Sequence, residues 1–144
     1  MRDSNKEKRE EWFAALQKAV SSDFIAYAMQ HNTSTDITWV YALGNRNDKY
    51  KRITVRYGKG IAGKVISTGS PISVDAFPDE IQGKALDYPI MLAEQLVSAH
   101  AVPLFYSGNP KGVLLIGRRQ VHPFNEKEKQ TIYVFAKEIE KWII

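Results

Sequence analysis

Hydrophobic residues recur at helical spacing near both ends of the chain. The amino-terminal stripe consists of Trp12, Phe13, Leu16, Ala19 and Val20. The carboxyl-terminal stripe consists of Ile132, Phe135, Ala136, Ile139, Trp142 and Ile143. Apolar positions three and four residues apart lie on one face of an α-helix. The pattern therefore predicts an N-terminal helix within residues 1–20 and a C-terminal helix over 125–144, where Asn125 and Glu128 have the spacing of a capping box.

Between these helices, short apolar runs bounded by turn residues predict β-strands. Such runs occur at residues 24–30, 37–43, 52–57, 72–74, 98–106 and 111–117. Tight turns such as GNRND after residue 43 and SGNP after residue 106 join consecutive runs, which implies antiparallel pairing. We therefore expect an α+β fold with a central antiparallel sheet of about five to six strands and both terminal helices on one of its faces.

Composition narrows the class of protein. The 144 residues are 44% apolar and 25% charged, as in one ordinary globular domain over 1–144. The absence of cysteine excludes disulfides, iron–sulfur ligation and thiol catalysis, and it fits a cytoplasmic protein. The net charge is +4, but basic residues alternate with acidic ones, as in NEKEKQ, so we expect no nucleic-acid partner. No apolar run approaches the length of a membrane span, so we expect no membrane partner either.

Residues 58–65, GKGIAGKV, satisfy two phosphate-binding patterns, the dinucleotide fingerprint and the start of a P-loop. Neither interpretation holds. Val65 stands where a P-loop needs Ser or Thr for Mg²⁺, and the alternating run RITVRY before the loop is unlike a buried parallel strand. Two interpretations stay open: glycines that serve a tight turn and close helix packing, or a helix start whose free backbone N–H groups face a ligand.

Two long segments resemble the GAF domain family. One is YGKGIAGKVISTGSPISVD, residues 57–75, and the other runs over 97–143, from VSAHAVPLFY through GVLLIG to FNEKE and the last helix. The resemblance covers nearly the whole chain. It implies the GAF fold, in which short helices and loops enclose a ligand pocket on the sheet face opposite the terminal helices. It does not imply one function, because GAF domains bind many different small ligands or none.

A narrower resemblance is to stand-alone GAF proteins that act as nitrate receptors. It implies that nitrate is the ligand and that the binding residues are Trp39, Ile61, Ala62, Tyr88 and Ile90. It also implies a sensor histidine kinase as partner, in a two-component system that controls nitrate and nitrite respiration. The chemistry agrees, since a planar, weakly hydrated anion suits backbone and indole N–H donors, and residues 58–74 contain no acid. For each residue, ordinary core packing is the alternative.

Catalysis is not expected. His31, His100 and His122 lack metal-ligand spacing, and no nucleophile motif occurs, so we predict a non-enzymatic protein without a cofactor or metal. His100 is expected to be a hydrogen-bonded structural residue. Two other functions stay open: a GAF module for another small ligand, and a ligand-free domain that docks on a kinase or forms a homodimer through its terminal helices. The second is motivated by the large apolar residues Trp12, Phe13, Trp142 and Ile143.

Overall fold

The structure is a computed structural model that describes residues 2–143, with six strands and four α-helices in that range. The strands are β1 (Phe24–Gln30), β2 (Asp36–Leu43), β3 (Thr54–Arg56), β4 (Ile72–Val74), β5 (Ser98–Tyr106) and β6 (Asn109–Arg118). The helices are α1 (Arg2–Ala19), α2 (Gly60–Thr68), α3 (Pro89–Glu94) and α4 (Glu126–Ile139), with 3-10 turns η1 (Lys49–Arg52) and η2 (Ala85–Asp87). All six strands belong to one sheet in the order β3-β2-β1-β6-β5-β4.

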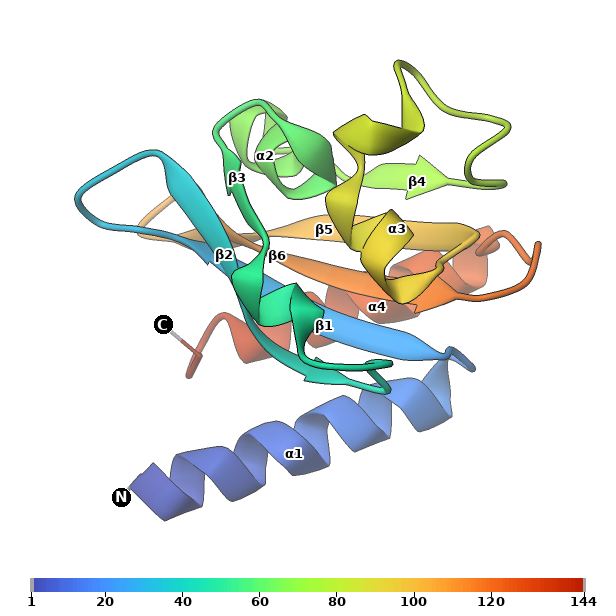
Figure 1. Ribbon diagram of the computed structural model, residues 1–144. Coiled ribbons are helices and arrows are strands. Elements are labelled where there is room, and N and C mark those ends of the chain that lie inside the picture. Colours follow the sequence, from blue (N-terminus) through green and yellow to red (C-terminus); the bar gives the residue numbers. More distant parts are fainter. Residues whose placement is uncertain (1, 144) are drawn as a thin grey trace.

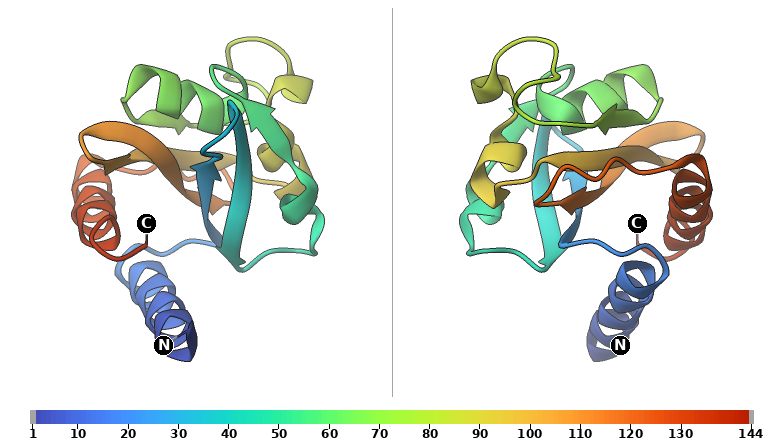
Figure 2. Two further views of the ribbon diagram at one scale, coloured as in Figure 1. Left: turned by 90° about the vertical axis from the view of Figure 1, so that its left-hand side faces the viewer. Right: turned by 90° about the vertical axis from the view of Figure 1, so that its right-hand side faces the viewer.

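Every neighbouring pair of strands is antiparallel, which confirms the predicted α+β class. Helices α1 and α4 cover one face of the sheet, whereas α2 and α3 lie on the other (Figures 1 and 2). We call these the α1/α4 face and the α2/α3 face. This arrangement also rules out a Rossmann-type crossover at the glycine loop, because β3 pairs antiparallel with β2.

Side-chain alternation along the strands divides the core into two clusters. On β6, Leu114 and Ile116 pack in the cluster under α1 and α4, while Val113 and Leu115 pack in the cluster under α2 and α3. Since successive residues of a strand point to opposite faces, a strand buried on both sides is apolar throughout, as the run GVLLIG is. The sheet is therefore the middle layer of a three-layer molecule.

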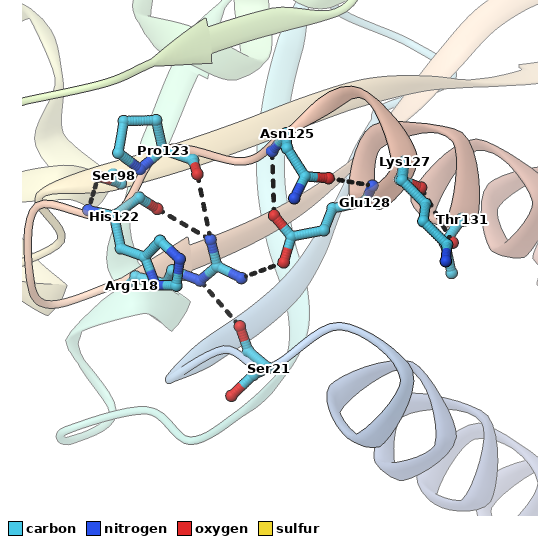
Figure 3. Close-up of polar contacts among 9 residues, drawn as sticks. All are labelled: Ser21, Ser98, Arg118, His122, Pro123, Asn125, Lys127, Glu128 and Thr131. Carbon is cyan, nitrogen blue, oxygen red and sulfur yellow. Dashed lines mark hydrogen bonds and ion pairs between the residues drawn. The ribbon is translucent and has the colours of Figure 1, made fainter.

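Arg118 connects the last strand to the segment that follows α1 and to α4 (Figure 3). Its guanidinium donates to the carbonyl of Ser21 at 2.8 Å, after the end of α1, and to the carbonyl of His122 at 2.9 Å. It also forms an ion pair of 2.6 Å with Glu128 of α4. Burial alone would raise the pKa of Glu128, but the hydrogen bonds from Arg118 and the backbone of Asn125 outweigh it and lower that pKa.

Several element boundaries differ from the sequence-based predictions. The C-terminal helix ends at Ile139 rather than at 144, and it begins at Glu126, because Asn125 is its N-cap. The run 52–57 yields only the short strand β3, because η1 occupies its start. The predicted limits Met1 and Ile144 lie outside the described residues.

Candidate functional site

Glycines shape the loop that leads into α2. Gly58 and Gly60 have φ of 82° and 63°, a region that favours glycine. Gly63 has a different reason: a Cβ there would lie 2.2 Å from the carbonyl oxygen of Arg56. The first turn of the helix thus packs directly against the backbone of the preceding strand. The turn-and-packing interpretation of these glycines is confirmed.

The amino-terminal end of α2 has the electrostatics of an anion site. Its N-cap, Lys59, makes no side-chain capping bond, and no acid lies in the first turn. The first four N–H groups of a helix lack intrahelical acceptors, and the helix dipole adds positive potential at this end. Ile61 and Ala62 contribute two of these N–H groups.

The five residues predicted to bind the ligand lie on the same face of the sheet. Trp39 comes from β2, Ile61 and Ala62 from α2, Tyr88 from the residue before α3, and Ile90 from α3. Each is at most 5% exposed, and all belong to the core cluster of the α2/α3 face. Their burial is what a closed pocket requires, and it equally fits core packing. Their role in binding nitrate stays a prediction.

A β-bulge determines which face Trp39 occupies. Tyr27 of β1 pairs with Tyr41, and the next residue, Ala28, pairs with Trp39, so Val40 is the extra residue of β2. Val40 is 44% exposed. Trp39 consequently packs in the α2/α3 cluster, whereas Tyr41 packs against the α1/α4 cluster. Simple alternation would have placed both aromatic side chains on one face.

Tyr88 already has partners for its hydroxyl and its ring. The hydroxyl donates to the carbonyl of Gln82 at 2.8 Å, so its proton must leave that bond to reach an anion. The ring centroid lies 5.7 Å from that of Phe77 and 5.3 Å from the Lys64 ammonium. Sequence reasoning missed Phe77 and Gln82. Both lie in the irregular segment before α3, where no periodic pattern marks a buried position.

A cavity of about 430 Å³ opens beside these residues. It lies between β3, the glycine loop and the η2–α3 segment. Arg56, Lys59 and Lys64 contribute positive charge to its wall, and Asp87 contributes one carboxylate. None of the five predicted residues lines it, although it reaches Gly60, the residue before Ile61. The cavity is therefore an electropositive vestibule next to the buried cluster.

Helix α3 is held in place by a buried carboxylate. Glu94, the last residue of α3, is fully buried. Its Oε1 accepts hydrogen bonds from the side chain of Arg119 at 2.7 Å and from the backbone N–H of Arg46 at 2.8 Å. Arg119 also donates to the Glu94 carbonyl. Because Ile90 lies in the same short helix, these bonds fix the position of the segment that follows Tyr88.

His100 lies away from this site. It is 5% exposed on β5, and its Nδ1 lies 2.7 Å from the hydroxyl oxygen of Ser73 on β4. Burial, with a contribution from the charge of Lys129, lowers the pKa of His100 to about 4. The prediction of a hydrogen-bonded structural histidine agrees with this geometry. Within residues 2–143, no three acidic or histidine side chains gather as a metal site would require.

None of the helices described has both the length and the apolar character needed to cross a bilayer. No curated protein matches the chain. Similarity is found among solved structures. A structure of an NreA protein from Staphylococcus aureus, mutated in its nitrate binding site, is 33% identical, with a TM-score of 0.79 over 88% of this chain and 94% of that chain. The hypothetical protein SA1058 from S. aureus is 36% identical, with a TM-score of 0.71 over 78% of this chain and 93% of that one.

A third solved structure shares the fold at lower identity. The free methionine-R-sulfoxide reductase from Neisseria meningitidis is 21% identical, with a TM-score of 0.72 over 89% of this chain and 71% of that chain. The sequence model of the GAF domain matches residues 13–140. That range leaves out the first twelve residues, so a single domain over 1–144 stays a prediction. With the six-stranded antiparallel sheet and its two helical layers, the match shows that the chain belongs to the GAF domain family.

Proposed function

We propose that this protein is a nitrate sensor that binds one nitrate ion on the α2/α3 face. The backbone N–H groups of Ile61 and Ala62 hold the anion at the start of α2. The indole N–H of Trp39 and the hydroxyl of Tyr88, once it turns from Gln82, add hydrogen bonds, and Ile90 closes the pocket. Similarity to NreA supports nitrate as the identity of the anion.

One observation carries this proposal: an uncapped helix start, free of acids, adjoins a cluster that contains all five predicted residues. Nitrate is planar, singly charged and weakly hydrated, so its desolvation costs less than that of phosphate. Backbone amides at a helix start suit such an ion. The cations around the vestibule favour the entry of an anion.

The signalling part of the proposal rests on the resemblance to stand-alone nitrate receptors. The protein acts in the cytoplasm, without catalysis and without a cofactor. It docks on a sensor histidine kinase and restrains that kinase until nitrate binds. The two-component system so regulated controls anaerobic nitrate and nitrite respiration.

Calorimetric titration with sodium nitrate tests the binding step. Sodium chloride and sodium sulfate control for ionic strength and for unselective anion binding. We expect saturable one-to-one binding of nitrate that is weakened in Trp39→Phe, which keeps an aromatic ring but loses the N–H donor. Val40→Thr, on the same strand but exposed, is the matched control and should bind like wild type. No heat from nitrate, together with an unchanged melting temperature, would exclude the proposal and leave another small ligand as the alternative.

A second function is favoured by the contact between α1 and the end of the chain. Trp12 and Trp142 pack with ring centroids 6.3 Å apart, and both buried indole N–H groups lack an acceptor among the described residues. Because both groups are buried, a partner supplies acceptors only if it opens the contact between the two rings, as a segment inserted by a second copy or by a docked kinase would. Sedimentation velocity of wild type and Trp142→Phe tests the homodimer, since a concentration-independent monomer contradicts it.

A further inference from the structure

The α1/α4 face contains a second cavity, of about 380 Å³, beside the first turns of α4. Its wall includes Ser73 of β4, His100 and Val102 of β5, and Lys129 and Tyr133 of α4. Val102 belongs to the core cluster of this face, whereas Ala101, between His100 and Val102, belongs to the opposite cluster. The cavity is thus separated from the proposed nitrate site by the sheet, and its volume suits a small ligand.

A buried histidine, His100, lines this cavity. Ser73 and His100 are directly paired across β4 and β5, and the hydroxyl engages Nδ1 of the ring. Nε2 is therefore the ring nitrogen left to meet a ligand. Since the hydroxyl can donate to Nδ1, the ring can present an N–H donor at Nε2. The hydrogen bond with Ser73 engages only Nδ1, so a structural role for His100 leaves Nε2 without a function.

Lys129 supplies a cation that is only weakly neutralised. Its ammonium lies 3.7 Å from a carboxylate oxygen of Glu126, whose side chain is 93% exposed. Exposed pairs of this length contribute little, because water competes for both charges. The Lys129 side chain itself is only 29% exposed. A ligand carboxylate that approaches more closely can therefore take the place of Glu126.

We propose that this cavity is a second ligand site, which binds a small organic monocarboxylate. The carboxylate lies between the Lys129 ammonium and the imidazole–hydroxyl pair of His100 and Ser73. The apolar body of the ligand packs against Val102 and the ring of Tyr133. A single cation matches a single negative charge, whereas a second charge on the ligand would face Glu126.

Titrations with benzoate and butyrate, followed by backbone amide NMR shifts, test this site. Benzamide and butyramide are matched neutral controls. We expect saturable shifts around His100 and Lys129 with the acids only. Lys129→Gln should weaken binding about tenfold, the loss of one charge-assisted contact. Glu126→Gln should strengthen binding, because it removes the competing carboxylate.

Trp39→Phe should leave carboxylate binding unchanged, since Trp39 lies on the other face, so failure of the nitrate proposal and failure of this one are distinguishable. Lys129→Gln and Glu126→Gln change the two members of a weak, largely exposed pair, so neither variant should prevent folding. Equal binding of the neutral amides, unchanged affinity in Lys129→Gln, or the absence of saturable shifts would each overturn the proposal.

Discussion

Arg118, the last residue of β6, and Arg119, which follows it, bind elements on opposite faces of the sheet. Arg118 points to the α1/α4 face, where it binds the carbonyl of Ser21 and the carboxylate of Glu128. Arg119 points to the α2/α3 face, where it binds Glu94. The alternation of a strand separates two neighbouring cations in this way. Two consecutive residues therefore hold α3, which contributes Ile90 to the proposed nitrate site, and α4 on the opposite face of the sheet.

Arg118→Met should destabilise the protein strongly. The side chain is 5% exposed, and its removal leaves a partly buried carboxylate and several carbonyls without their donor. Breaking a buried ion pair of this kind typically costs about 3 kcal/mol or more. Urea unfolding followed by far-ultraviolet circular dichroism measures the loss. Lys51→Met, which breaks an exposed pair with Asp48 at 3.8 Å, is the control and should change little. Equal stability of the two variants would contradict a stabilising role of the buried contacts of Arg118.

The local part of this network was predictable from the sequence, and the distant part was not. The spacing of Asn125 and Glu128 predicts a capping box, and both of its bonds are present, at 2.8 Å and 3.0 Å. The ion pair of Glu128 with Arg118 depends on how α4 docks beside β6. No periodicity in one segment contains that information, because docking is decided by packing between segments.

The bulge in β2, at the candidate site, also could not be predicted from the sequence. Residues 37–43 alternate well enough to predict a strand, but a period of two carries no sign that Val40 is an extra residue. Deletion of Val40 would remove the bulge and leave Trp39 and Tyr41 adjacent, paired with Ala28 and Tyr27 as now and still on opposite faces of the sheet. We expect the free energy of unfolding to fall by only about 1 to 3 kcal/mol, because both aromatic side chains can keep their clusters.

Circular dichroism and urea unfolding of the deletion variant measure this effect. Val40→Thr keeps the bulge and changes only an exposed side chain, so its midpoint should stay close to that of wild type. A deletion variant that fails to fold would contradict this expectation and would show that the sheet needs the bulge itself.

The five predicted ligand residues lie in one cluster, and their positions came from the resemblance to stand-alone nitrate receptors. Their individual side chains, mostly apolar, could not distinguish a pocket wall from ordinary core. Phe77 and Gln82, which contact Tyr88, could not be predicted from the sequence for a different reason. Their segment has irregular backbone, so no repeat of apolar positions predicts which residues face inward.

Two glycines of the loop should respond differently to alanine. At Gly58 a Cβ meets no atom within 4 Å, and only its φ of 82° opposes the change, at a cost of about 1 kcal/mol. At Gly63 the Cβ would collide with the Arg56 carbonyl, so α2 must move from the strand. We expect Gly63→Ala to be the more destabilising in urea unfolding and to impair nitrate binding more. The opposite order would mean that α2 shifts freely, without loss of its packing.

Acid should destabilise the protein through His100 before most carboxylates are protonated. A histidine in an unfolded chain has a pKa near 6.5, whereas burial, with Lys129, lowers the pKa of His100 to about 4. Above pH 6.5 the ring is neutral in both states, so it contributes no pH dependence. Between pH 6.5 and 4 the unfolded chain binds a proton that the folded protein does not, and stability falls as the pH is lowered. The total loss from this residue is about 3 kcal/mol.

Urea unfolding at intervals between pH 7.5 and pH 5 isolates the effect of His100. His100→Gln retains a group that can hydrogen-bond to Ser73 but cannot take up a proton in this range. By pH 5 the free energy of unfolding should have fallen by about 2 kcal/mol more in wild type than in this variant. The reason is that pH 5 lies about 1.5 units below the pKa of histidine in the unfolded chain. His31 and His122 are present in both proteins, so their contributions cancel. Parallel pH profiles would mean that the imidazole is as easily protonated in the folded protein as in the unfolded chain, and its burial beside the second cavity would then have to be abandoned.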